Sequence, residues 1–181
     1  MSQQYTDVMV DLETTGTDPE HAAIIQLTAV RFNLTTREID HEWFNECLLV
    51  PPNRFWSEDT LRWWQRHPEV LRDIQVRMRD PAEVMAEFYK WANGCQDSLH
   101  FWSKPLSFDF PFLASYCRTY GWPNPYDFRK GRDVRTYLWA TNPNFDESAV
   151  PFIGPAHNAL FDVLHQIRLL YAAPLQQEEL G

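Results

Sequence analysis

Apolar and polar residues alternate along residues 5–13, which predicts a β-strand because successive side chains of a strand point to opposite faces. Residues 23–32 are apolar at most positions and predict a central strand that is buried on both faces. Residues 38–49 predict a third strand, joined to the second by the short polar segment 33–37. The chain is therefore predicted to begin with a meander of three strands, in which Asp11 and Glu13 share one face of the first.

The periodicity becomes helical in the middle of the chain. Ser57 and the two acids after it are typical of a helix start, and this helical region is predicted to end near Pro68. A clearer helix is predicted from the capping residue Asp80 to Gly94, because Pro and then Glu follow the cap at favourable positions. Its predicted core stripe consists of Val84, Met85, Phe88 and Ala92.

The second half of the chain alternates between strand and helix. A short strand is predicted over 99–102, a helix over 109–120 that Gly121 closes, and a long C-terminal helix over 158–172. Strands first and alternation later predict an α/β fold with a mixed sheet. No repeat or flexible linker divides the 181 residues, of which 44% are hydrophobic, so we expect one domain over 1–181.

The net charge, taken alone, argues against a nucleic-acid partner. The chain has 16 Lys and Arg against 25 Asp and Glu, which gives a formal charge of −9, and an acidic surface does not favour a polyanion. The densest basic run, residues 129–135, could hold the phosphates of a strand entering a site. A solvated turn explains that run equally well.

Cysteine usage and the N-terminal segment indicate a cytoplasmic protein. Cys47, Cys95 and Cys117 are odd in number and lie far apart, with no spacing typical of a metal site. The segment MSQQYTDV lacks the basic stretch and apolar region of a signal peptide, and no apolar run approaches the roughly 20 residues that span a bilayer. We therefore expect a soluble protein with no membrane partner.

The first candidate for chemistry is the sequence DLETTG at 11–16. Two carboxylates on one strand face can reach the same hard divalent cation, and Gly16 lets the backbone turn away beside them. The alternative, of about equal weight for this motif alone, is a pair of solvated strand acids.

Two further candidates lie at predicted helix starts. Asp109 lies among large apolar residues that would hold it near the sheet, although an ordinary N-cap aspartate is the commoner explanation of such a position. Asp162 lies off the apolar stripe of the C-terminal helix, and His157 precedes that helix in a loop. A His and an Asp five residues apart are, by themselves, more often surface residues than catalytic ones.

Together these residues suit one reaction. Two divalent ions about 3.5–4 Å apart can activate water and stabilise the leaving oxygen of a phosphodiester, which requires a dense cluster of carboxylates. A histidine with a pKa near neutral can accept the proton of that water. Oxygen ligands of this kind suit Mg²⁺.

Three motifs, taken in order, resemble those of the DEDDh, or DnaQ-like, 3′–5′ exonucleases: DLETTG at 11–16, FD at 108–109 and HNALFD at 157–162. The resemblance covers residues 5 to about 172, and DxETTG followed by HxAxxD is a specific combination. It implies an RNase H-like fold with a five-stranded mixed sheet flanked by helices. It also implies release of nucleoside 5′-monophosphates from the 3′ ends of single-stranded RNA or DNA, or from 3′ overhangs.

The resemblance also implies roles for individual residues. It implies that His157 is the general base and that substrate contacts involve Leu12, Thr14 and Phe108. The implied ligands of two Mg²⁺ or Mn²⁺ ions are Asp11, Glu13, Asp109 and Asp162.

In one place the sequence departs from the family pattern. Family members often carry Asn before the second motif, where this chain has Pro105-Leu106-Ser107, so the substrate contacts of this loop are not carried over. Asp133 matches a position where the family often has Asp, but we favour a helix cap or an ion pair over a metal ligand. Related small exonucleases are often dimers, which makes a homodimer compatible with the resemblance.

Aromatic residues and the other histidines have competing explanations. Stacking on unpaired bases is one role for the aromatics, and core packing or a dimer contact is the commoner one. The remaining histidines have no partner at ligand spacing and are predicted to be structural. The aromatics are Phe55, Trp56, Trp63 and Trp64, and the histidines are His21, His41, His67, His100 and His165.

The sequence is compatible with an enzyme or with a binding protein. Retention of all five motif residues favours a 3′–5′ exonuclease over a catalytically silent relative that binds nucleic acid or protein with the same fold. An oligoribonuclease-like enzyme, specific for short oligonucleotides, is a third reading.

Overall fold

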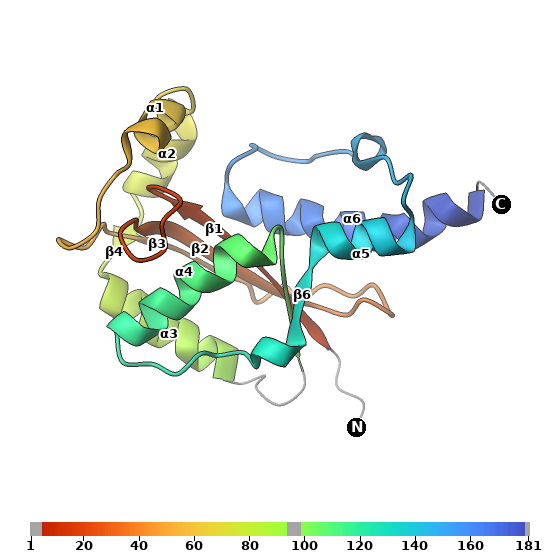
Figure 1. Cartoon of the computed structure of the whole chain (residues 1–181), viewed down its shortest axis with the longest axis horizontal. Coiled ribbons are helices and arrows are strands. Elements are labelled where there is room, and N and C mark those ends of the chain that lie inside the picture. Colours follow the sequence, from red (N-terminus) through yellow and green to blue (C-terminus); the bar gives the residue numbers. More distant parts are fainter. Residues whose placement is uncertain (1–4, 94–98, 180–181) are drawn as a thin grey trace.

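A computed structural model describes residues 5–93 and 99–179 (Figure 1). Its centre is one mixed sheet of six strands in the order β4-β3-β2-β1-β5-β6. β1 pairs antiparallel with β2, and β2 with β3, while β5 and β6 continue the sheet parallel to β1. The strands are β1 (Asp7–Thr14), β2 (Ile24–Phe32), β3 (Phe44–Leu48), β4 (Met78–Arg79), β5 (His100–Ser103) and β6 (Gly131–Asp133).

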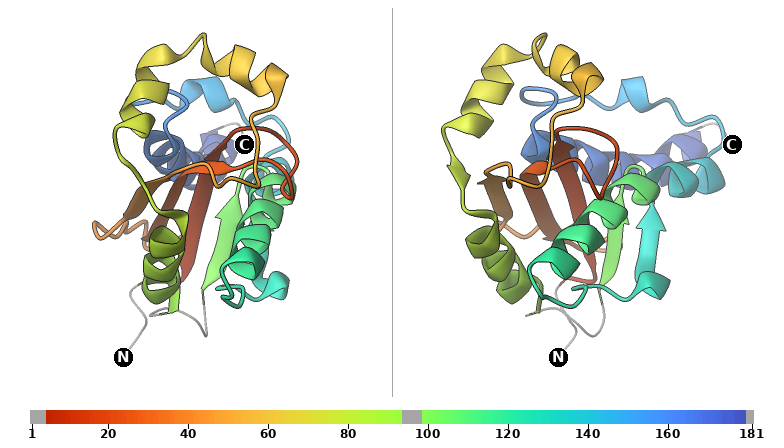
Figure 2. Two further views of the ribbon diagram at one scale, coloured as in Figure 1. Left: turned by 90° about the vertical axis from the view of Figure 1, so that its left-hand side faces the viewer. Right: turned by 60° about the vertical axis from the view of Figure 1, so that its left-hand side comes forward.

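Helices cover both faces of the sheet, and two short ones lie over its end (Figures 1 and 2). α3 and α4 pack on one face and α5 and α6 on the other, while α1 and α2 lie beyond the end of β1 (Figure 2). The helices are α1 (Glu58–Trp64), α2 (Pro68–Gln75), α3 (Pro81–Asn93), α4 (Leu106–Thr119), α5 (Val134–Thr141) and α6 (Ala159–Glu179), with 3-10 turns η1 (Phe128–Lys130) and η2 (Glu147–Ala149).

The alternation of β1 divides the core into two layers. Val8, Val10 and Leu12 pack in the cluster that includes α3 and α4, whereas Met9 packs with the apolar stripe of α6. Asp11 and Glu13 share the Met9 face, as the sequence pattern predicts. The two acids therefore point toward the helix that carries Asp162.

Parallel strands bring distant segments to the same edge of the sheet. β1, β5 and β6 run in one direction, so their carboxyl ends at Thr14, Ser103 and Asp133 meet at one edge. α4 begins there directly after β5, and α5 begins there directly after β6. This edge is where a ligand site of an open α/β sheet is expected.

The predicted mixed sheet flanked by helices is confirmed, but its strand number was wrong, because six strands form instead of five. The additional pairing comes from β4 and β6, which are two and three residues long and have no pattern of their own. The predicted strand over 38–49 forms only as β3, because the residues before it make one isolated bridge, from Ile39 to Phe32, and then a turn in which the Asp40 carboxylate accepts the Glu42 N–H at 3.0 Å. The predicted helical region before Pro68 ends at Trp64, and a second helix begins at Pro68.

The helix predicted over 109–120 begins three residues earlier, at Leu106. The carboxylate of Asp133 accepts the Leu106 N–H at 2.9 Å and caps this end from a distant part of the chain. Asp109 therefore lies inside the first turn of α4 and is not its cap. α6 confirms the predicted C-terminal helix and continues to Glu179.

Two further expectations concern the cysteines and membranes. Cys47 and Cys117 are free and buried, and Cys95 lies outside the described residues, as does the predicted helix end at Gly94. In the described part of the chain, no helix combines the length and the hydropathy needed to cross a bilayer.

Candidate active site

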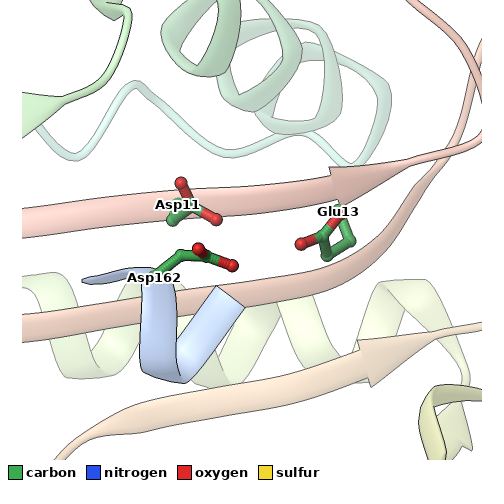
Figure 3. A group of neighbouring side chains, drawn as sticks. All are labelled: Asp11, Glu13 and Asp162. Atoms are coloured by element: carbon green, nitrogen blue, oxygen red, sulfur yellow. The ribbon is translucent and has the colours of Figure 1, made fainter. Parts of the chain in front are cut away.

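Three carboxylates converge between β1 and the first turn of α6. One oxygen atom each from Asp11, Glu13 and Asp162 lies within 4.8 Å of the other two. Figure 3 shows the two β1 side chains and the α6 side chain pointing toward one another. All three are partly buried, and such a set of oxygen donors suits a hard divalent cation.

Asp109, in the first turn of α4, contacts β1 next to this group. It is 2% exposed, and its carboxylate accepts the backbone N–H of Leu12 at 3.2 Å. Asp109 does not belong to the close set of three oxygens, but its charge raises the pKa values of Asp11 and Glu13. The structure thus brings all four predicted ligands to one edge of the sheet, with three of them in direct convergence.

Burial raises the pKa values of all four carboxyl groups, and repulsion from neighbouring acids adds to this for Asp11 and Glu13. Burial, and then the charges of Asp109 and Asp162, hold the pKa of Asp11 well above its usual range. Burial, and then the charge of Asp11, do the same to the pKa of Glu13. Burial raises the pKa of Asp109 to about 7 and that of Asp162 to about 6. A bound cation would reverse these shifts.

The start of α6 is fixed to the sheet by amide side chains. The side-chain oxygen of Gln26, on β2, accepts the backbone N–H of Ala159 at 3.2 Å. Its side-chain nitrogen donates to Asn158 at 3.3 Å, and Asn158 in turn accepts the Leu160 N–H at 3.2 Å. Because Gln26 is paired with Glu13 across the two strands, these contacts set the position of Asp162 relative to the β1 acids.

Asp11 has a second fixed partner on α6. The side-chain nitrogen of Gln166 donates to Asp11 Oδ1 at 2.8 Å. Gln166 lies four residues after Asp162, so both residues are on the same side of the helix. This hydrogen bond orients the Asp11 carboxylate toward Asp162.

His157 lies beside the carboxylates in a ring cluster with α1 and α2. Its ring centroid is 4.7 Å from that of Trp63 and 4.6 Å from that of His67. Its backbone has φ 63°, an uncommon value for a residue other than glycine, and strained backbone of this kind often marks a functional site. Burial, and then the charge of His67, lower the pKa of His157 below its ordinary value.

A glycine shapes the loop that presents His157. Gly154 has φ 109°, and a Cβ atom there would lie 2.1 Å from the ring of Phe161. Only glycine meets both conditions. The loop can therefore pass close over the first turn of α6 before it reaches His157.

A cavity of about 410 Å³ opens beside the carboxylates. Glu13 is in its wall, and so are the three residues predicted to contact substrate, Leu12, Thr14 and Phe108. Asp59 and Trp63 of α1 also line it. The pocket thus combines two carboxylates with aromatic side chains.

Two of the other candidates from the sequence have structural roles, and two keep their predicted role in stacking. Asp133 is a helix cap, as favoured, because it accepts the N–H groups of Thr136 and Leu106. Trp64 is a core residue, 1% exposed, whose indole donates to the Thr14 carbonyl. Stacking by Phe55, which is exposed, and by Trp56 stays a prediction.

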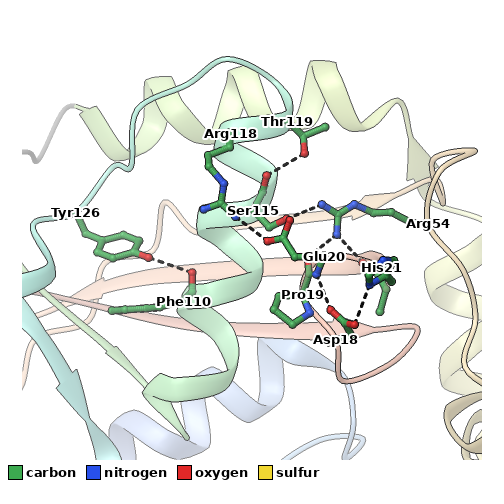
Figure 4. A network of polar contacts seen from close by, with 11 residues as sticks. Asp18, Pro19, Glu20, His21, Arg54, Phe110, Ser115, Arg118, Thr119 and Tyr126 are labelled. Atoms are coloured by element: carbon green, nitrogen blue, oxygen red, sulfur yellow. Dashed lines mark hydrogen bonds and ion pairs between the residues drawn. The ribbon is translucent and has the colours of Figure 1, made fainter.

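The loop after β1, which carries Gly16, is held against α4 by Arg54 (Figure 4). The guanidinium of Arg54 donates to the carbonyls of Pro19 and Ala22 at 2.7 Å each, and to the Ser115 hydroxyl at 2.7 Å. Arg54 is 5% exposed, so these acceptors have little access to water.

Replacing Arg54 by Met is therefore expected to lower the free energy of unfolding by about 3 kcal/mol, because two buried acceptors and one partly buried acceptor lose a charged donor. Arg118→Met provides a matched control, since the Arg118 ion pair with Glu20 is well exposed and should contribute less than about 1 kcal/mol. Urea denaturation of both variants measures the difference. Equal effects would contradict the anchoring role of Arg54.

Three residues of the site were missed by sequence reasoning. Gln26 is fully buried in a strand that is otherwise largely apolar, and that interruption was a usable signal. Gln166 and His67 gave no such signal, because their partners lie far away in the sequence. His67, which is predicted to be structural, contacts the candidate base.

A family model described as the 3′-5′ exoribonuclease Rv2179c-like domain matches residues 6–173 of this chain. The chain belongs to this family. The match covers all three motifs, and the resemblance to 3′–5′ exonucleases is confirmed. No curated protein matches the sequence at a significant level.

Solved structures with the same fold include exonucleases I. The zinc-bound Escherichia coli exonuclease I complex with single-stranded DNA has a TM-score of 0.74 and 15% identity, covering 98% of this chain and 42% of the other. Exonuclease I of Methylocaldum szegediense has a TM-score of 0.68 and 16% identity, covering 95% and 40%. The Rv2179c-like chain thus spans less than half of these neighbours, and the likeness establishes its RNase H-like fold.

Proposed function

We propose that this Rv2179c-like domain is a metal-dependent 3′–5′ exonuclease that removes nucleoside 5′-monophosphates from single-stranded RNA. The observation that carries the proposal is the convergence of Asp11, Glu13 and Asp162 within 4.8 Å, beside a nucleotide-sized cavity. The family description supports RNA as the substrate. The exonuclease I complex with single-stranded DNA supports an unpaired strand, and DNA is the second candidate substrate.

The donor set fits divalent metal. Asp11, Glu13, Asp109 and Asp162 would hold two Mg²⁺ or Mn²⁺ ions, because four acids with raised pKa values form a site that favours positive charge. When bound, such ions neutralise the phosphodiester and acidify water. Gln166 keeps Asp11 oriented for this task through its 2.8 Å hydrogen bond.

His157 would act as the general base. A lowered pKa keeps its imidazole neutral at pH 7 and able to accept a proton from the attacking water. Its ring is held by contacts with Trp63 and His67, and its backbone hydrogen bond to Asp162 keeps the residue next to the acids. His157 is itself partly exposed, so its imidazole could pass this proton on to solvent.

The cavity would take the 3′-terminal nucleotide. Phe108 and Trp63 offer flat faces to its base. Glu13 lines the same cavity, so the sugar and the scissile phosphate of that nucleotide would lie toward the acids. Single-stranded ends suit this pocket because an unpaired base is free to enter it and stack on an aromatic side chain.

Digestion of matched RNA, single-stranded DNA and duplex with a 3′ overhang, each with Mg²⁺ and with EDTA, tests the proposal. We expect stepwise shortening of RNA that EDTA stops. Binding without shortening would favour a silent relative, and shortening only of very short chains would favour an oligoribonuclease-like enzyme. Equal cleavage in EDTA would contradict the metal role.

A further inference from the structure

A second cavity, about 730 Å³ in volume, lies between α4 and β6, outside the candidate active site. Its walls include Leu106, Phe110 and Pro111 of α4, Tyr126 and Phe128 before β6, and Thr136 of α5. We refer to it as the α4–β6 groove. The right-hand view of Figure 2 shows α4 beside β6, with η1 at the lower end of the strand.

The groove presents fixed aromatic surfaces. The Tyr126 hydroxyl donates to the Phe110 carbonyl at 3.1 Å (Figure 4), and their ring centroids are 4.3 Å apart. Phe128 is different, because 76% of it is exposed although it is a large apolar residue. An exposed aromatic beside a cavity is a typical stacking platform for an unpaired base.

Positive charge accompanies this platform in an otherwise acidic chain. The Arg129 guanidinium lies 4.4 Å from the Phe128 ring centroid, and its side chain is 72% exposed. Its ion pair with Asp127 is exposed and long, at 3.4 Å, so it competes weakly with another anion. Arg132 follows on β6, within the densest basic run of the sequence. An aromatic ring beside a guanidinium can bind a nucleotide, because the ring stacks on the base and the guanidinium binds the phosphate.

The first turn of α4 lies between the groove and the active-site cavity, and its residues line both. Ser107 lines the groove, whereas the next residue, Phe108, lines the cavity beside Glu13. A strand with its 3′ end at the acids can therefore cross the start of α4 and enter the groove.

We propose that the α4–β6 groove binds upstream nucleotides of the single-stranded substrate, with a base stacked on Phe128 and a phosphate bound by Arg129. This inference rests on the exonuclease function proposed above and adds a second binding region to it. A single strand fits better than a protein segment, because the patch pairs an exposed ring with an exposed guanidinium in a chain of net charge −9.

The dependence of kcat/KM on substrate length tests the inference. The substrates are unstructured oligoribonucleotides of mixed sequence, two to eight nucleotides long, with Mg²⁺. We expect kcat/KM of the unaltered protein to rise with length and then level off. Phe128→Leu should reduce the value for the longest substrate by at least about 5-fold, with little change for the dinucleotide, and Phe128→Tyr should restore it.

Arg129→Ala should also reduce the gain with length, and should lower the salt dependence of KM for long substrates by about one unit of slope. Arg118→Ala is the matched control, because this arginine is similarly exposed and also paired with an acid, and it should change neither.

The outcomes separate the two proposals. If no substrate of any length is hydrolysed, the exonuclease function itself fails. If dinucleotide and octanucleotide are hydrolysed with equal kcat/KM, the groove has no role and the exonuclease function stands. If Phe128→Leu changes the sedimentation coefficient but not the length dependence, the groove is a contact between two copies, and the inference is overturned.

Discussion

Asp11→Asn is expected to reduce the hydrolysis of RNA by at least about 10³-fold, which corresponds to about 4 kcal/mol of transition-state stabilisation. Asp11 is central to the acidic group. Its carboxylate lies close to that of Asp162, and the charges of Asp109 and Asp162 both raise its pKa. Asn can still accept the hydrogen bond of Gln166 at Oδ1. The loss should therefore come from the missing charge and not from altered packing.

The same substitution should stabilise the metal-free protein. The pKa of Asp11 is raised in the folded state, so the folded protein binds more protons than the unfolded chain as soon as the pH exceeds the ordinary value of about 4. The contribution of Asp11 to the free energy of unfolding therefore falls as pH rises from the ordinary pKa of an aspartate to the raised pKa of Asp11 in the folded protein. In EDTA at pH 8, Asp11→Asn should raise Tm by at least about 3 °C, or about 1 kcal/mol for a domain of this size.

Thermal melts at pH 5 and pH 8, with EDTA and with Mn²⁺, measure both effects. Mn²⁺ should raise the Tm of the unaltered protein more at pH 8 than at pH 5, and should do much less for Asp11→Asn. Glu69→Gln, which removes an exposed acid of α2, serves as the control and should behave like the unaltered protein. A variant that is less stable in EDTA at pH 8 would contradict the repulsion among these acids.

His157→Asn is expected to reduce kcat by about 10²- to 10⁴-fold, which is the usual contribution of a general base. Asn is chosen because, like His, it tolerates the left-handed backbone found at this position. The fold and the metal response should be retained, since neither depends on the imidazole.

The pH dependence of kcat distinguishes a base from a merely structural ring. With saturating Mg²⁺, kcat should rise with pH, with a midpoint below 6.5, because the pKa of His157 is lowered by burial and by His67. His67→Ala removes the nearby charge and should move that midpoint upward. A variant His157→Asn that keeps both the kcat and the pH profile of the unaltered protein would rule out the assigned role.

Local patterns in the sequence were sufficient to predict which side chains lie on each face of the sheet. The alternation of β1 placed Val8 and Val10 on one side and Asp11 and Glu13 on the other, because the geometry of a strand allows no other arrangement. The long apolar run of β2 correctly predicted a central, fully buried strand.

What the sequence could not provide depends on contacts between distant segments. The start of α4 was misplaced by one turn because its cap, Asp133, lies 27 residues further along the chain. β6 is three residues long, and only its pairing with β5 makes it a strand.

The candidate site shows the same division. The three motifs pointed to Asp11, Glu13, Asp109 and Asp162, which the fold brings to one sheet edge. The contact of His67 with His157 depends on where α2 packs, and no local pattern reports that. The net charge has the same limit, because it does not report that three of the acids, Asp11, Glu13 and Asp162, converge at one place with Asp109 behind them.

The central claim is that these acids support hydrolysis from a 3′ end. Digestion of an RNA labelled at its 5′ end, with Mg²⁺ and with mass analysis of the products, tests it most directly. The account predicts a ladder of labelled chains that shorten one nucleotide at a time, together with nucleoside 5′-monophosphates. Early release of a labelled mononucleotide, internal fragments or nucleoside 3′-monophosphates would contradict it.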